Sequence, residues 1–174
     1  AVGLSLLDLI RRIAHPHDGV LGYVPGVAGM HDVDDYAAAT QVPGLVVYRY
    51  DSPLFFANAD DFLFRALAAA RVAEPAAEWF VLNAEANVEV DLTAVDTLAE
   101  LRRTLADEGV VFAMARVKME VRQQLDAAGL LDEIGEDHIF ATLPTAVEGF
   151  AAWHLSRYGT RPAGVPEATA KPES

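Results

Sequence analysis

Two rhythms of hydrophobic and polar positions alternate along this chain. Short β-branched and aromatic runs, such as "GLVVYRY" (44–50) and "EWFVLNA" (78–84), predict buried strands. Longer stretches with apolar residues three and four positions apart predict amphipathic helices. The predicted strands are 44–50, 54–57, 78–84, 110–115 and 138–142, and the predicted helices are 58–73, 93–107, 117–129 and 145–158.

The order of these elements predicts the fold class. Strands that alternate with helices form a largely parallel sheet, because each parallel neighbour needs a crossover connection. The turn signal "DSP" (51–53) separates the first two predicted strands, which we expect to pair as an antiparallel hairpin. The prediction is an α/β domain with a mixed, mostly parallel sheet of about four or five strands and about four helices.

The segments on either side of this pattern read differently. Residues 15–44 are rich in Gly and Pro and carry no sustained period, which predicts a loop or linker. Their glycine spacing matches neither dinucleotide-binding nor Walker loops. The end of the chain is rich in Pro, Ala and Gly and is predicted to be disordered. The predicted organisation is a leading segment at 1–42, a domain at 43–158 and a tail at 159–174.

The leading segment begins with an apolar stretch that is followed by Arg11 and Arg12. It is shorter than the roughly 20 apolar residues that a membrane span needs. Two interpretations stay open. The segment is an ordinary amphipathic helix, or it lies just cytoplasmic of a membrane span, where positive charge is expected. The apolar side of the predicted helix consists of Leu6, Leu9, Ile10 and Ile13.

Charge and composition exclude several classes of function. The chain has 174 residues and a formal net charge of −13, which disfavours nucleic acid as a partner. The absence of Cys excludes disulfides, thiolate metal sites and cysteine nucleophiles. No nucleophile and base stand out, so we predict a protein that is not an enzyme. Its five His residues are scattered, and His138, beside a predicted strand, is interpreted as structural.

The acidic stretch "HDVDD" (31–35) resembles a loose metal cluster. It lacks the Gly and the terminal Glu of a calcium loop. A solvated acidic turn is therefore favoured over a metal site, and no metal ligand is assigned.

The stretch "VEVDLTAVDTLAEL" (88–101) carries the best candidate site. Ligands of an open α/β sheet gather beyond the carboxyl ends of strands, where helices begin. Asp91 and Thr93 lie at such a place, beside N–H groups and the positive end of a helix dipole. Thr93 and Asp96 have capping-box spacing, with Asp in place of Glu. Two interpretations stay open: a helix cap, or a hydroxyl that meets a phosphoryl group or a partner.

Several segments together resemble the STAS domain family, and in particular the STAS domain of an actinobacterial-like, SulP-type (sulfate permease) anion transporter. The resemblance covers roughly residues 5–155 and implies a STAS fold, like that of anti-sigma-factor antagonists. It also favours the juxtamembrane interpretation of Arg11 and Arg12. The matching segments are "VPGVAGMHDVDDY" (24–36), "PGLVVYRYDSPLFFANADDF" (43–62), "DLTA" (91–94) and "AMARVKMEVRQQLDAAGLLDEIGEDHIFATLPTAVEGF" (113–150).

This resemblance implies a regulatory, non-catalytic domain at the cytoplasmic face of a membrane. Such a domain would modulate the transport of sulfate or another anion. Its implied partners are the transmembrane domain of the same transporter and cytoplasmic regulatory proteins.

In the stand-alone relatives, a Ser at the position of Thr93 is phosphorylated, and an Asp at the position of Asp91 supports that site. Here the acceptor is Thr, and Ala94 replaces the usual Gly. The resemblance therefore implies the location of a regulatory site rather than the reaction. The alternative function is a soluble anti-sigma-factor antagonist that works as a phospho-switch.

Nucleotide binding has also been proposed for several STAS domains. This chain has no Walker motif, so GTP or ATP would bind weakly to backbone groups at the start of the helix. No other cofactor is expected. The residues assigned to a possible nucleotide or partner site are Asp91, Leu92, Thr93, Ala94 and Val95.

Overall fold

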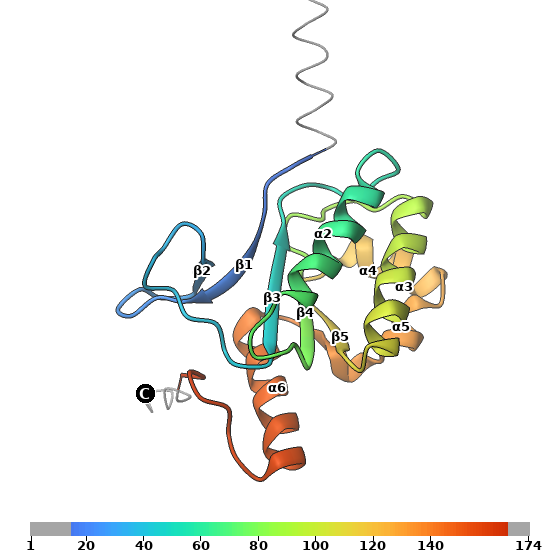
Figure 1. Ribbon diagram of the computed structural model, residues 1–174. Coiled ribbons are helices and arrows are strands. Elements are labelled where there is room, and N and C mark those ends of the chain that lie inside the picture. Colours follow the sequence, from blue (N-terminus) through green and yellow to red (C-terminus); the bar gives the residue numbers. More distant parts are fainter. Residues whose placement is uncertain (1–14, 167–174) are drawn as a thin grey trace, which may run out of the picture.

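A mixed six-stranded sheet organises the protein (Figure 1). The structure is a computed structural model that describes residues 15–166. Its elements are β1 (Asp18–Tyr23), β2 (Met30–Asp32), β3 (Leu45–Tyr50), α2 (Ala59–Arg71), β4 (Trp79–Asn83), α3 (Leu92–Asp107), β5 (Val111–Ala115), α4 (Met119–Ala127), α5 (Leu130–Ile134), the 3-10 helix η1 (Glu136–His138), β6 (Ile139–Phe140) and α6 (Leu143–Tyr158).

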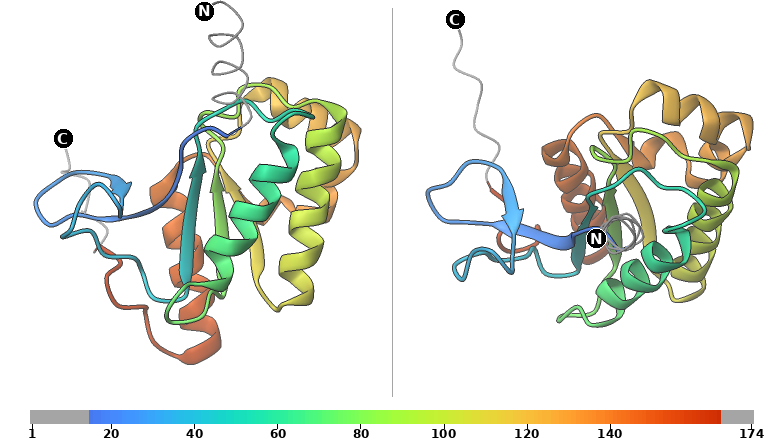
Figure 2. Two further views of the ribbon diagram at one scale, coloured as in Figure 1. Left: turned by 45° about the horizontal axis from the view of Figure 1, so that its top comes forward. Right: turned by 90° about the horizontal axis from the view of Figure 1, so that it is seen from above.

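The strands lie in the order β2-β1-β3-β4-β5-β6. The four strands from β3 to β6 are parallel, while β1 pairs antiparallel with both β2 and β3. Helices α2, α3, α4 and α5 cover one face of the sheet, and α6 covers the other (Figure 2). The prediction of an α/β domain with a mixed, mostly parallel sheet is confirmed.

Strand β4 shows why the central strands read as unbroken apolar runs. Trp79 and Val81 belong to the core beneath α6, whereas Phe80 and Leu82 belong to the core beneath the other helices. All the residues of β4 are buried. A strand covered on both faces has no polar side, so its sequence does not alternate.

Two predictions about the first part of the sheet are wrong. The segment 15–44, predicted as a loop, contains β1 and β2. The antiparallel neighbour of β3 is β1 rather than 54–57, where Leu54 makes only an isolated parallel bridge to Val90. Two of the glycines that suggested a loop, Gly19 and Gly22, lie in β1 and have a packing role instead. A Cβ at Gly19 would overlap the carboxylate of Asp32, so β1 passes close to Asp32 only without a side chain there.

The predicted helices are present, but their limits differ. Helix α3 begins at Leu92, one residue before the prediction, and α6 begins at Leu143, with Pro144 in its first turn. Proline suits this position because the first N–H groups of a helix have no partner within it. The helix predicted at 117–129 is α4, which gives way to the separate α5 at Gly129. Gly129 has φ +75°, the left-handed conformation that favours glycine.

The two flanking segments are described only in part. The helix predicted over Leu6, Leu9, Ile10 and Ile13 lies outside the described residues. Of the tail predicted to be disordered, residues 159–166 are described. There, Pro162 is buried and Arg161 forms an ion pair with Glu148 (2.6 Å). Across residues 15–166, every helix is too short or too polar to cross a membrane.

Phe80 and Phe64 offer a matched test of the core. Phe80 in β4 is 0% exposed and Phe64 on the outside of α2 is 75% exposed. We expect Phe80→Ala to lower the free energy of unfolding by about 3–5 kcal/mol through lost burial and a residual cavity. Phe64→Ala should change it by less than about 0.5 kcal/mol, because surface substitutions seldom matter more. Urea unfolding followed by circular dichroism measures both, and equal effects would contradict the packing described.

Candidate functional site

Two loops meet beyond the carboxyl ends of β3 and β4. The N–H of Leu54 donates to the carbonyl of Glu89 (3.1 Å), and the N–H of Asp91 donates to the carbonyl of Leu54 (3.3 Å). This pair of bonds is the Leu54–Val90 bridge. It fixes the loop after β3 against the segment that leads into α3.

Asp91 braces this junction with both oxygens of its carboxylate. Oδ1 accepts a hydrogen bond from the N–H of Ala94 (2.8 Å), which makes Asp91 the N-cap of α3. Oδ2 accepts from the N–H of Phe56 (2.8 Å) in the neighbouring loop. One side chain therefore caps the helix and holds the loop after β3 in place.

Thr93 has a different role from the one that its spacing suggested. It lies in the first turn of α3, after the cap, so the capping-box interpretation of Thr93 with Asp96 is wrong. Its carbonyl accepts a bond from the hydroxyl of Thr97 (2.9 Å). Its own hydroxyl is exposed, with no hydrogen-bond partner among the described residues. The cap is thus supplied by Asp91, and the Thr93 hydroxyl is accessible to a phosphoryl group or a partner.

The five residues assigned to a nucleotide or partner site are adjacent but not equivalent. Leu92 is 75% exposed and Thr93 is also exposed, whereas Asp91 is half-buried. Ala94 and Val95 are buried, with their side chains in the core. A ligand at this corner therefore meets chiefly the side chains of Asp91, Leu92 and Thr93, while Val95 contributes a small exposed part to the adjoining hollow.

Two buried asparagines stabilise the same junction. Asn58 is the N-cap residue of α2, but its side chain makes no capping bond. Its Oδ1 accepts from the N–H of Phe55 (3.0 Å), and its Nδ2 donates to the carbonyl of Pro53 (2.9 Å). Asn87 donates from Nδ2 to the carbonyls of Ser52 (2.7 Å) and Tyr50 (3.2 Å). A polar residue between apolar neighbours was the only signal for either contact.

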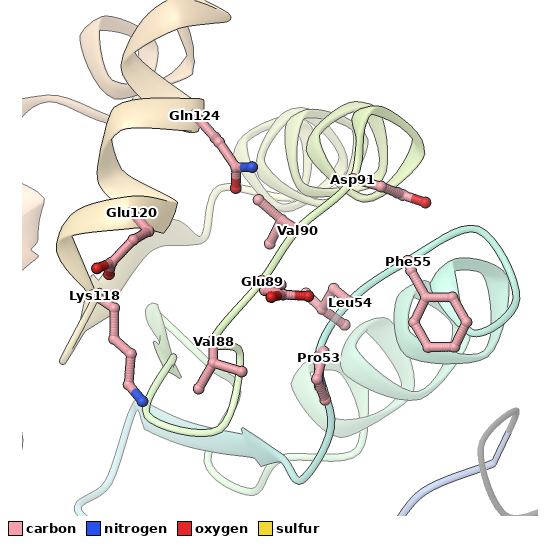
Figure 3. Close-up of a pocket in the computed structure, with 10 residues that line it drawn as sticks. All are labelled: Pro53, Leu54, Phe55, Val88, Glu89, Val90, Asp91, Lys118, Glu120 and Gln124. Carbon is pink, nitrogen blue, oxygen red and sulfur yellow. The ribbon is translucent and has the colours of Figure 1, made fainter.

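A groove opens between this junction and α4. Its larger part has a volume of about 800 Å³, and a smaller, more apolar part of about 300 Å³ continues along α3. Figure 3 shows Lys118, Glu120 and Gln124 on the side of α4, across from the segment 88–91. We call this hollow the Asp91 groove. It is lined by Pro53, Leu54, Phe55, Val88, Glu89, Val90, Asp91, Lys118, Glu120 and Gln124, and in its smaller part also by Leu92, Val95, Ala127 and Ala128.

The groove is mainly acidic at its polar positions. Three carboxylates, those of Glu89, Asp91 and Glu120, line it together with a single cation, Lys118. Within residues 15–166, none of these four side chains takes part in a salt bridge. Most arginines of the described chain, in contrast, are paired with an acid. The groove therefore presents a net negative charge to a ligand.

A second polar cluster holds the start of the described chain against α2. Asp18 in β1 forms an ion pair with Arg65 and accepts a hydrogen bond from the hydroxyl of Tyr48 (2.6 Å). Asp61 accepts from the hydroxyl of Tyr50 (3.0 Å). Burial, and then the hydrogen bond to Asp18, raises the pKa of Tyr48 well above its usual value. The Tyr48 hydroxyl therefore stays a donor throughout the physiological range.

His138 and Asp32, the latter in the acidic stretch 31–35, both contact the backbone. His138 lies near a backbone carbonyl, with its Nδ1 3.1 Å from the oxygen of Ile134, which supports the structural interpretation. Asp32 is buried and accepts from the N–H of Asp34 (3.0 Å), so the prediction of a solvated turn is wrong for this residue. Over residues 15–166, no three His, Cys, Asp or Glu side chains are arranged to hold a metal ion.

A mixed sheet with helices on both faces and a braced strand-to-helix corner at its carboxyl end defines this protein as a small α/β domain. The sequence model of the STAS domain matches residues 36–146. This match covers more than half of the chain, which therefore belongs to the STAS domain family.

Sulfate transporters are among the proteins with similar sequences. The "Probable sulfate transporter Rv1739c" of Mycobacterium tuberculosis is 67% identical over 150 residues, which cover 86% of this chain and 27% of that protein. The "Probable sulfate transporter 3.5" of Arabidopsis thaliana is 26% identical over 148 residues, which cover 85% of this chain and 23% of that protein. The chain thus spans about a quarter of the length of these relatives.

Solved structures share the fold. The murine anion transporter Slc26a9, in its inward-facing state, matches with a TM-score of 0.73 and 23% identity, over 84% of this chain and 24% of that one. The SulP transporter STAS domain from Vibrio cholerae matches with a TM-score of 0.55 and 21% identity, over 72% of this chain and 94% of that one. The predicted STAS fold is confirmed, with six strands and five α-helices described.

Substitutions of Asp91 separate its two bonds. We expect Asp91→Ala to lower the free energy of unfolding by about 2 kcal/mol, since it removes the cap and the bond to Phe56. Asp91→Asn keeps an oxygen acceptor for only one of the two N–H donors, so its effect should be smaller. The control is Asp96→Ala, at an exposed position of the same helix. Urea unfolding measures all three, and an Asp91→Ala effect no larger than the control would contradict the brace.

Proposed function

We propose that this chain is the regulatory, non-catalytic STAS domain of a SulP-type transporter of sulfate or a related anion, at the cytoplasmic face of the membrane. The 67% identity to a probable sulfate transporter carries the proposal. The domain acts through contacts with the transmembrane part of the same polypeptide or with cytoplasmic proteins. The identity of the transported anion follows from that transmembrane part.

The geometry of the α3 corner supports a regulatory role. Thr93 presents an exposed hydroxyl beside Asp91, on a helix end that hydrogen bonds fix in place. A phosphate on Thr93 would add a charge of about −2 next to the Asp91 carboxylate and the positive end of α3. Repulsion by Asp91 and attraction by the helix end act in opposite directions. A change of charge at Thr93 would therefore alter a surface contact without rebuilding the fold.

Uptake by the full transporter tests this function. Thr93→Glu should change the initial rate of sulfate uptake by membrane vesicles at least twofold, because it places a negative charge on the regulatory corner. Thr93→Ala and Ser156→Glu should stay within about 20% of the natural protein, since a small change at a surface position is usually tolerated. Ser156 is an exposed residue of α6 and controls for added charge. Equal uptake by Thr93→Glu and Ser156→Glu would contradict regulation at this corner, and no uptake by the natural protein would contradict the transporter.

A soluble anti-sigma-factor antagonist is the alternative function. The exposed Thr93 hydroxyl favours it, because a kinase needs an accessible acceptor. A putative anti-sigma factor antagonist from Thermotoga maritima has the same fold, with a TM-score of 0.52 at 18% identity. Incubation with a cognate kinase, followed by intact-mass measurement, distinguishes the two functions. A phospho-switch requires that the kinase adds one phosphate to the natural protein and none to the Thr93→Ala variant.

Weak binding of GTP or ATP at the α3 corner is a further part of the proposal. The first N–H groups of α3, at Leu92 and Thr93, suit a phosphate. The carboxylates of Glu89, Asp91 and Glu120 oppose it, so we expect only millimolar affinity. A nucleotide titration followed by NMR should shift the amide signals of Asp91–Val95. The amide signal of Ser156, the control, should not shift. Unchanged signals at Asp91–Val95 would contradict nucleotide binding at this corner.

A further inference from the structure

The chain enters the described domain at the same end as the Asp91 groove. His15 Nδ1 lies 2.8 Å from Asp61 Oδ1, and Arg65 donates to the carbonyl of Pro16 (3.2 Å). In Figure 1 the described chain begins at the top of the view, the end toward which the β3 arrow points. The groove lies beyond the carboxyl ends of β3 and β4, which is this same end of the sheet.

The entry point is held firmly in that position. Asp18, three residues after His15, pairs with Arg65 and accepts from Tyr48, while Asp61 accepts from Tyr50. These contacts join β1 to both α2 and β3. A part of the polypeptide that is attached ahead of the domain therefore approaches it from the groove end rather than from an arbitrary direction.

Large apolar side chains are exposed around the groove. Leu92 is 75% exposed, Phe56 is 73% exposed and Val88 is 37% exposed. Val88 and Leu92 line the groove, and the backbone of Phe56 is bonded to Asp91. Isolated exposed apolar residues are normal, but several at one hollow mark a contact surface.

The charge of the groove selects the partner. Its three carboxylates outnumber its single cation, Lys118, so the groove repels nucleic acid and anionic lipid and attracts cations. Cytoplasmic loops of membrane proteins carry an excess of Lys and Arg. A basic loop with apolar residues matches both the carboxylates and the exposed rim.

We propose that the Asp91 groove and its apolar rim bind a basic, amphipathic cytoplasmic loop of the transmembrane part of the same polypeptide. This rests on the proposed function, which supplies that transmembrane part. Thr93 then lies at the edge of the contact, and negative charge there changes how the loop binds. The Asp91 groove, which is exposed in the isolated domain, is then covered by this loop in the transporter.

Thiol labelling of the full transporter in inside-out membrane vesicles tests the contact. This chain has no Cys, so Leu92→Cys, Val88→Cys and Val72→Cys each add a single thiol to the domain, with any cysteine elsewhere in the transporter replaced by Ser. Val72, near the far end of α2, is 76% exposed and matches Leu92 at 75%. The probe is fluorescein maleimide, and each rate is normalised to that of the same variant in SDS.

We expect the groove thiols at positions 92 and 88 to react at least tenfold more slowly than the thiol at position 72. Combining Glu89→Lys and Glu120→Lys with Leu92→Cys should raise its rate to that of the Val72→Cys control, because the new charges repel a basic loop. Equal rates at positions 92 and 72 in the natural background would overturn the contact. Two other results would also overturn it. The thiol at position 92 could stay equally slow after the lysines are added, or it could become slower still, which would indicate that lipid covers the groove.

Two further readouts distinguish the loop contact from a dimer of the domain and from a failure of the transporter itself. A bismaleimide that joins two Leu92→Cys chains into a dimer would show a second copy in the groove and overturn the proposal. Sulfate uptake is measured in the same vesicles. Normal sulfate uptake together with fast labelling at position 92 would contradict the loop contact alone. Absence of sulfate uptake by the natural protein would contradict the proposed transport function.

Discussion

The Asp91 carboxylate joins two loops that follow different strands, and the arrangement of the whole carboxyl end depends on it. Each of its oxygens accepts one backbone N–H, from Ala94 in α3 and from Phe56 in the loop after β3. Backbone donors at a helix start and in a packed loop need such partners, because an N–H that is shielded from water and unpaired is costly. The same carboxylate thus ends one connection, begins a helix and forms part of the wall of the groove.

Around this brace, some polar side chains are bonded within the domain, while others line the groove and form no salt bridge within residues 15–166. The amides of Asn58 and Asn87 hold the loop 52–58, and Arg65 pairs with both Asp18 and Asp61 at the chain entry. Glu89, Glu120 and Lys118 line the groove without salt-bridge partners inside the described domain. Rigid support next to net negative charge and exposed apolar side chains supports the proposed binding of a partner at this corner.

The predictions from sequence succeeded where one period dominated and failed where packing decided. The runs at β3, β4 and β5 and the apolar stripes of α2, α3 and α6 were placed within a few residues. Strand β1 was missed because Gly19 and Gly22 resemble loop glycines, although the lack of a side chain at each serves a close approach to another segment. The hairpin at 54–57 was wrong because local turn chemistry does not say which distant strand supplies the partner.

The sequence by itself determined the α/β class, the family resemblance and the position of the corner at Asp91 and Thr93. These features are local, since hydrophobic period and the residues at a helix start act within a few positions. Only the tertiary structure decided that Asp91 rather than Thr93 is the cap, that its second oxygen braces Phe56, and that α4 closes a groove over the same corner. The cap itself is a local contact between Asp91 and Ala94, but the bond to Phe56 and the groove join residues that are far apart in the chain. Long-range pairing of this kind is set by how the layers pack.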